Sequence, residues 1–463
     1  MSLLFSSATG VFQTFRCSRH CTIGALALGM LLATAADGID LELAAPRPEP
    51  LAPPQLMMEA DLPPAAPSYP QLPAALAGGG DLDAAAMLAQ QMLDATAAAY
   101  GEKDGRAAVA LVNLATVHER QGRYDAAIGE YRQALDRLQD QAGLRDPRQI
   151  TPWYGLGLSY FQTGDYADAA AAFQNALQLH RMSYGLFRLG QLDFYAALAR
   201  TYLALGRQRD ADNYQIRRLT TAIRVLGADN PKLVPVIQAV ARWYHDSGRH
   251  VVEHVLYSDI VKLLQHAHAP DEPKLFEFLI ATARSALEAP QVSAGIGVRE
   301  ARSMASEILH RPADGSATPP AVQARQWLEL GDLYFQTGDH EQALQSYRRA
   351  ATLLDASGSQ AAEAAFGRPV LLSMAPLFSP PPVHSGAPSG FVEVEFTVTD
   401  DGRAADLKVL RSGPPGSPAV TDKAAKLVRA LRDALFRPRI LNGEPQRTEH
   451  VDYRYTFDVP VQK

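Results

Sequence analysis

The chain has 463 residues, of which 47% are hydrophobic and 20% are charged, a composition typical of a globular protein with about three domains. Its net charge of −6, with no run of like charge, argues against a nucleic-acid surface, an acidic tail or a polybasic membrane patch. Both cysteines, Cys17 and Cys21, precede an apolar run near the N-terminus, so the remainder needs neither disulfides nor a reducing compartment.

Residues 1 to 36 have the pattern of a targeting segment. Arg16 and Arg19 precede an uncharged apolar run from Thr22 to Ala36, with small residues suited to cleavage after Ala35. This pattern predicts a secretory signal peptide, and the run is shorter than the roughly 20 residues that span a membrane. We therefore expect a periplasmic protein. The alternative is an uncleaved N-terminal anchor in the inner membrane, which would be the chain's only membrane contact.

Residues 37 to 80 are predicted to be an extended spacer. Prolines crowd the stretch from 44 to 73, and proline fixes φ and removes an amide donor. A proline-rich ligand for another domain is the less favoured alternative, because the prolines repeat no motif. Asp81 follows three glycines and is expected to cap the first helix.

Residues 81 to 356 show a helical repeat. From Trp153 to Leu177, large and small residues alternate at helical spacing on both sides of a turn at Gly164. Gly157 and Ala169 are expected to let two helix backbones approach while aromatic side chains fill the gaps. Similar patterns occur at Leu111 to Ala134 and at Trp327 to Ala350.

Two series of glycines repeat every 42 residues, half a repeat out of phase: Gly122, Gly164, Gly206 and Gly248, and Gly101, Gly143, Gly185 and Gly227. One series is expected inside each helix pair and the other between pairs, because helix ends often need a residue at positive φ. The pattern resembles the tetratricopeptide repeat, and a period above the usual length of about 34 residues resembles the variant of kinesin light chains.

The later repeats are less regular. The third and fourth units carry Gln215, Arg218 and Glu253 where aromatic or small residues are expected. Lys274 to Leu287 and Val298 to Leu309 are predicted to form a further, degenerate helix pair. We expect a mainly α fold, an α-solenoid of tetratricopeptide type whose irregular units act as caps or bends.

A Pro/Gly linker at residues 357 to 389 precedes a small α+β domain at 390 to 463. Alternating residues predict a strand from Phe391 to Thr399 and a second from Ala404 to Arg411, with Leu407 and Val409 facing inward. The turn at Asp401-Gly402 joins them as a hairpin. A helix from Val420 to Leu435 and a last strand, Thr448 to Val459, follow.

This domain resembles the C-terminal domain of TonB-type energy transducers. The matching features, in order, are Gly390 to Val394, Asp401-Gly402-Arg403, Arg411-Ser412-Gly413, Ala424-Ala425, Phe436-Arg437-Pro438, Asn442-Gly443 and Tyr455-Thr456-Phe457. The family often has a Tyr-Pro pair before the first strand, where this chain has Pro382-Val383-His384-Ser385, which argues against coupling to an outer-membrane receptor.

Each resemblance implies a binding surface. Repeat proteins of this kind bind ligands on the first helix of each pair, which here implies a groove formed by Glu119, Arg120, Tyr154, Phe161, Arg200, Arg242, His245, Asp332 and Phe335. Arginines and aromatics suit an extended or acidic peptide, although each residue taken alone is better explained as an ordinary solvated helix residue. In the TonB-like domain the last strand, with Val451, Tyr453, Tyr455 and Phe457, is the candidate edge for adding a partner strand.

One motif suggests an enzyme. His250, Glu253 and His254 have the order and helical spacing of one class of zinc metallopeptidase. They also fall in the second helix of the fourth unit, where packing or surface roles are ordinary, and no further acidic ligand stands out. We therefore predict no catalytic residue, no bound metal and no cofactor.

The preferred interpretation is a periplasmic adaptor that binds envelope proteins or peptides through the groove and the β edge, with no nucleic-acid partner. The alternative is a membrane-anchored energy transducer of TonB type that couples to outer-membrane transport. A zinc metallopeptidase is the third, least favoured hypothesis.

Overall fold

The computed structural model describes residues 51–57, 72, 81–266, 272–291, 294–310, 319–355, 365–374, 389–415, 417–441 and 443–458. These residues fall into two compact units that divide between Val236 and Ile237. The predicted targeting segment, most of the spacer and the proline cluster before residue 389 lie outside the described residues. A helix with the length and apolar character of a membrane span is not found among the residues described.

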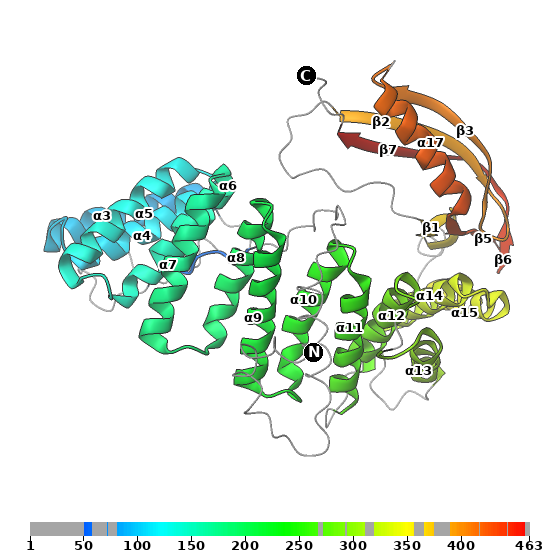
Figure 1. The fold of residues 1–463 in the computed structure, drawn as a ribbon, viewed down its shortest axis with the longest axis horizontal. Coiled ribbons are helices and arrows are strands. Elements are labelled where there is room, and N and C mark those ends of the chain that lie inside the picture. The colour runs from blue at the N-terminus through cyan, green and yellow to red at the C-terminus, as the bar shows by residue number, and fades with distance from the viewer. Residues whose placement is uncertain are drawn as a thin grey trace, which may run out of the picture. The chain divides into compact units, whose positions relative to one another are not determined.

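The first unit is a series of antiparallel helix pairs (Figure 1). Its helices are α3 (Leu82–Tyr100), α4 (Gly105–Arg120), α5 (Tyr124–Ala142), α6 (Ile150–Thr163), α7 (Tyr166–Tyr184), α8 (Leu192–Ala204) and α9 (Gln208–Leu226). Short 3₁₀ turns η3 (Pro147–Gln149), η4 (Leu189–Gln191) and η5 (Pro231–Leu233) lead into the next pair. The side chain of Asp81 accepts hydrogen bonds from the amides of Asp83 and Ala84, which confirms the predicted cap.

Both glycine series lie where they were predicted. All eight glycines have positive φ, between 69° and 96°. The series that begins at Gly122 follows α4, α6, α8 and α10, and the series that begins at Gly101 follows α3, α5, α7 and α9. A residue with a Cβ atom would be strained at these positions, so the glycines set the period of the helix pairs.

Glycines inside the first helices make room for large side chains of the second helices. A Cβ atom on Gly157 would lie 2.6 Å from the ring of Phe173, and one on Gly331 would lie 2.5 Å from Tyr347. Phe173 and Tyr347 are fully buried. The predicted nesting of large against small residues therefore forms the core of these pairs.

The second unit continues with helices and ends in a β-rich part. Its helices are α10 (Val234–Asp246), which begins at the boundary, α11 (His250–Gln265), α12 (Glu272–Glu288), α13 (Val298–His310), α14 (Pro320–Gln336) and α15 (His340–Asp355). Helices α12 and α13 form where the degenerate pair is predicted, and α14 and α15 form the unit that contains Trp327.

The β-rich part contains β1 (Val370–Ser373), β2 (Ser389–Val398), β3 (Ala404–Gly413), α17 (Pro418–Asp433), β4 (Leu435–Arg437), β5 (Arg439–Leu441), β6 (Glu444–Gln446) and β7 (Thr448–Asp458). Strands β3, β2 and β7 form an antiparallel sheet in that order. Buried residues of β2, α17 and β7 form its core around Val394, Phe396 and Leu431. Helix α17 lies against the sheet (Figure 1).

Two local predictions in this part are wrong. The helix ends at Asp433, and Leu435 belongs to β4. Val409 is 41% exposed although it pairs with the buried Val394 of β2, and a β-bulge at Leu410 follows it. Leu407, two residues earlier, packs against the core as expected.

Candidate functional site

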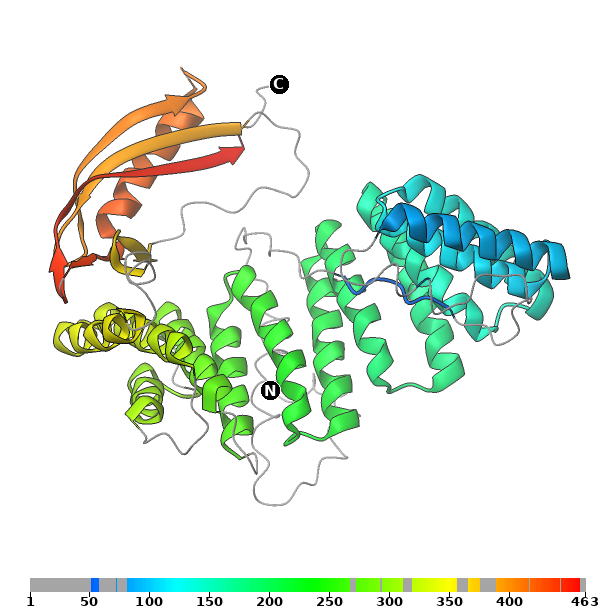
Figure 2. The ribbon, with the colours of Figure 1, turned by 180° about the vertical axis from the view of Figure 1, so that it is seen from behind.

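An extended segment of the chain's own spacer, Leu51–Met57, lies along the first unit (Figure 2, dark blue). The side chain of Asn113 on α4 makes two hydrogen bonds to one residue of it. Asn113 Oδ1 accepts from the amide of Met57 at 2.8 Å, and Nδ2 donates to the Met57 carbonyl at 2.9 Å. The hydroxyl of Tyr154 on α6 donates to the Ala52 carbonyl at 3.0 Å. Main-chain groups of the segment are thus held from two successive repeats.

Asn113 is fully buried within an apolar stretch of α4. Burying an amide without partners costs free energy, and both of its polar atoms find partners on Met57. Asn113 is not among the predicted groove residues. A single amide inside an otherwise apolar first helix was the signal that could have revealed it.

Four of the predicted groove residues, Glu119, Tyr154, Phe161 and Arg200, are linked by charge and ring contacts. The ring of Tyr154 packs 5.4 Å from that of Phe173. Burial raises the pKa of its hydroxyl, with Asp193 and Glu119 adding to the effect and Arg200 opposing it. The guanidinium of Arg200 lies 4.9 Å from the centre of the Phe161 ring.

Glu119 and Arg120 complete the predicted part of the groove on α4. Burial raises the pKa of Glu119, and the charge of Arg120 opposes this. The Nε atom of Arg120 is buried and finds no acceptor among the described residues. The surface around Tyr154 therefore carries the Tyr154 hydroxyl and the Asn113 amide, both of which bind main chain. Beside them lie the cations Arg120 and Arg200 and the partly buried acid Glu119.

The predicted groove residues of the second unit behave differently. Arg242 and His245 on α10 are exposed. Asp332 and Phe335 on α14 are 8% and 4% exposed because the β-rich part covers them. Arg437 Nη1 donates to both carboxylate oxygens of Asp332 at 2.9 Å. These two side chains therefore hold the chain's own C-terminal part.

Several contacts surround that ion pair. The hydroxyl of Tyr347 donates to Asp332 Oδ1 at 2.9 Å, and Arg437 Nη2 donates to the Ala365 carbonyl at 3.2 Å. Burial raises the pKa of Asp332, with Arg437 opposing the shift. At the rim, Arg348 pairs with Glu444.

At the predicted β edge, the main chain of β7 faces a possible partner strand, whereas the four predicted side chains face the core. Val451, Tyr453, Tyr455 and Phe457 pack into or against the core under α17. Strand β7 pairs with β2 on one side and with no other strand among those described. A partner strand could therefore add to β7 through main-chain hydrogen bonds, with its side chains beside those of β7 on each face of the sheet.

The three residues of the metallopeptidase motif do not form one site. His250 Nδ1 contacts Glu253 Oε2 at 2.8 Å. The Nδ1 atom of His254 instead faces the Thr282 carbonyl and the Ser285 hydroxyl, both at 3.2 Å, in a buried position against α12. Burial lowers the pKa of His254, which favours its neutral form.

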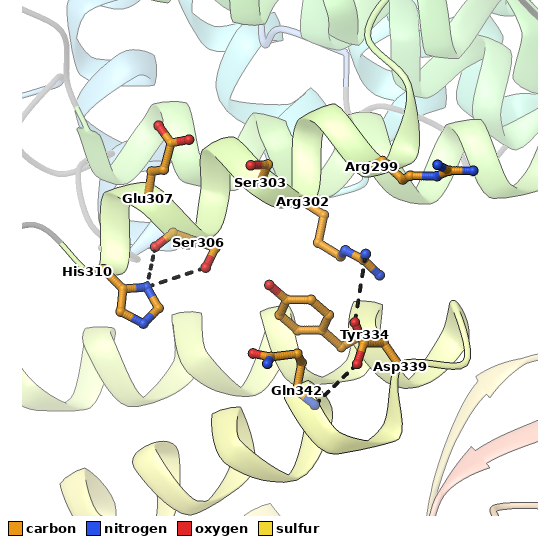
Figure 3. Close-up of a pocket in the computed structure, with 9 residues that line it drawn as sticks. All are labelled: Arg299, Arg302, Ser303, Ser306, Glu307, His310, Tyr334, Asp339 and Gln342. Carbon is orange, nitrogen blue, oxygen red and sulfur yellow. Dashed lines mark hydrogen bonds and ion pairs between the residues drawn. The ribbon is translucent and has the colours of Figure 1, made fainter.

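A separate polar cavity of about 380 Å³ lies between α13 and the α14–α15 pair (Figure 3). Its arginine Arg302 donates to the Thr337 hydroxyl at 2.6 Å and lies 3.9 Å from the carboxylate of Asp339. His310 bonds back to Ser306 on its own helix (Figure 3). The polar groups of Arg302 and His310 thus already have hydrogen-bond or ion-pair partners within the protein, so the cavity is a weaker candidate than the surface around Asn113.

Comparison with known families identifies the repeats. Models of the tetratricopeptide repeat match residues 74–140 and 148–222, and another such model matches 324–353. The chain therefore carries tetratricopeptide repeats, as predicted, within a mainly helical solenoid followed by a small β-rich part. Comparison with curated proteins finds no match.

Several solved structures are similar to the chain. BtubC (BKLC) from P. vanneervenii is 18% identical with a TM-score of 0.36, covering 60% of this chain and 92% of that one. The repeats of a putative kinesin light chain from Podosopora anserina are 17% identical with a TM-score of 0.34, covering 46% and 93%. A repeat protein from Cytophaga hutchinsonii is 14% identical with a TM-score of 0.39, covering 60% and 93%.

Proposed function

We propose that the protein is a binding scaffold, without catalysis, whose first repeats hold an extended peptide by its main chain. The two hydrogen bonds between Asn113 and Met57 are the observation that carries this proposal. An amide side chain that pairs with both the N–H and the C=O of one residue recognises extended backbone in any sequence. Binding of peptides or proteins is also the use expected of tetratricopeptide repeats.

The chemistry of the bound segment suggests the class of partner. Residues 51–57 include two prolines, and Pro54 is buried. Proline-rich peptides are already extended before they bind, so they lose little conformational entropy. We infer that the partner presents an extended, proline-containing or apolar stretch, and that the chain's own segment occupies the site until that partner displaces it.

The proposal also includes where the protein is located and what residues 390–463 do. The signal-like pattern at residues 1 to 36 supports a periplasmic adaptor for envelope proteins, and the strand and helix order supports a TonB-like domain with β7 as its edge. Mass spectrometry of the mature N-terminus from cell fractions tests the location. A chain that begins near Ala36 supports the adaptor, whereas an intact N-terminus supports a membrane-anchored energy transducer.

A peptide competition experiment tests the groove. In the full chain, residues 51–57 are replaced by a glycine-serine stretch of equal length, and a fluorescent peptide with the sequence of residues 46–60 is added. We expect this chain to bind the peptide, and the unaltered chain to bind it at least about tenfold more weakly, because the tethered segment competes at a millimolar effective concentration.

Substitution of Asn113 gives the specific test. Asn113→Ala in the replaced chain should weaken binding of the peptide by about 30-fold, since two hydrogen bonds contribute about 1 kcal/mol each. Gln133→Ala, at an exposed position on α5, is the matched control and should leave binding unchanged. Equal binding by the Asn113→Ala and control chains would refute the proposed site.

A further inference from the structure

Four potential metal ligands converge where α10, α11 and α12 meet. His245 lies at the end of α10, His250 begins α11, Glu253 follows one turn later, and Glu288 is the last residue of α12. Each offers one ligand atom, and these four atoms all lie within 4.8 Å of one another. His254, the third residue of the sequence motif, is not among them.

The distances suit a four-coordinate ion. His245 Nδ1 lies 3.0 Å from Glu253 Oε1 and 4.0 Å from Glu288 Oε2. His250 Nδ1 lies 2.8 Å from Glu253 Oε2 and also 2.8 Å from Glu288 Oε2. Ligand atoms around a tetrahedral zinc ion are about 3.3 Å apart, given metal–ligand bonds of about 2.0–2.2 Å. The four atoms lie within 4.8 Å of one another, so side-chain shifts of about 1 Å would place all of them around one ion.

Charge and burial favour a cation at this point. Glu253 is only 4% exposed, and each of its carboxylate oxygens faces an imidazole. A buried carboxylate needs a positive charge beside it. The hydrogen bonds that His250 donates to the carboxylates of Glu253 and Glu288 raise its pKa to about 10, which reflects the same negative field. Two carboxylates and two neutral imidazoles would balance one divalent ion.

We propose that His245, His250, Glu253 and Glu288 bind one zinc ion. Imidazole nitrogens with carboxylate oxygens suit zinc, whereas calcium and magnesium prefer oxygen ligands alone. Four protein ligands fill a tetrahedral shell, which is the pattern of a structural site and leaves no open position for a hydrolytic water. The ion ties the turn between α10 and α11 to the end of α12.

Zinc titration of the full, tag-free chain after chelator treatment tests this site. Isothermal calorimetry should show one ion per chain, and zinc should raise the melting temperature. His245→Gln and Glu288→Gln each remove a half-exposed ligand and should weaken binding by roughly 100-fold or more, because even outer groups contribute 10–100-fold. His266→Gln, an exposed histidine at the end of α11 outside the cluster, is the matched control and should bind as the unaltered chain does.

Cobalt provides a readout that does not depend on the variants. Co²⁺ bound by the unaltered chain should show the intense visible absorption of a four-coordinate ion, and zinc should displace it. The proposal is overturned if zinc does not bind saturably, if the chain with both His245→Gln and Glu288→Gln binds zinc as tightly as the control, or if the cobalt spectrum is that of a six-coordinate ion.

Discussion

Asp332→Asn should release the β-rich part from α14 without unfolding the repeats. The substitution keeps the shape of the side chain and removes its charge. Arg437 would then stay buried, at 5% exposure, with no counter-charge, while one of the two acceptors that Nη1 uses would become an N–H donor. The positive charge of Arg284 also acts on Asp332, so neutralising the acid removes a counter-charge from both arginines.

The size of the effect follows from burial. Removing one partner of a buried ion pair costs about 3–5 kcal/mol, because the other charge is left without compensation. A loss of this size shifts the docking equilibrium by a factor on the order of 100 or more. Removing both charges, as in Asp332→Leu with Arg437→Met, should recover most of the loss, since the desolvation cost disappears with them.

Hydrogen exchange measured by mass spectrometry can follow this release. We expect faster exchange in β4 and in the part of α14 that it covers, with no change in α4 to α7. Arg348→Met is the matched control at the same interface: its pair with Glu444 is about half exposed on both sides, and such pairs contribute at most about 1 kcal/mol. Equal effects of the buried and exposed substitutions, or no recovery in the double variant, would refute this reasoning.

Two further predictions concern packing and pH. Gly157→Ala should lower the melting temperature, since the new Cβ lies 2.6 Å from the buried ring of Phe173 and overpacking costs about 1–3 kcal/mol. Gly129→Ala on α5 is the control: no atom lies within 4 Å of its new Cβ, so the substitution should raise the melting temperature through better helix propensity. Metal-free protein should lose thermal stability as the pH rises from 6.5 through about 10, because the folded state holds the His250 proton more tightly than the unfolded chain. Glu288→Gln should flatten that pH dependence, and an unchanged profile would contradict the assigned charge partner.

The helix pairs and their period could be predicted from the sequence because their causes are local. Positive φ at a glycine such as Gly164, and apolar residues at helical spacing, act within one or two turns of the chain. The alternation that predicts β2 and β7 is local in the same way. Val409 shows the limit of this reasoning: it pairs with the buried Val394 and is still exposed, because alternation along one strand does not determine which neighbouring elements cover each residue.

The sites depend on groups that are far apart in the chain. Asn113 meets Met57 across 56 residues, and Asp332 meets Arg437 across 105. Neither partner could be inferred from spacing, since the packing of whole helices and strands brings them together. Asp332 therefore looked like part of an open groove, and only the tertiary structure revealed what covers it.

The histidines show the same difference between what local spacing predicts and what the packing of helices decides. Helical spacing alone groups His250 with His254, because residues four apart share a face. In the folded chain His254 turns to Thr282 and Ser285 of α12, while His245 and Glu288 approach from neighbouring helices. The sequence by itself determined that these residues lie on adjoining helices of a repeat. The packing of those helices decided which side chains share a site. Distances between side chains on different helices depend on how the helices are placed and rotated relative to one another, and the sequence of one helix does not determine this.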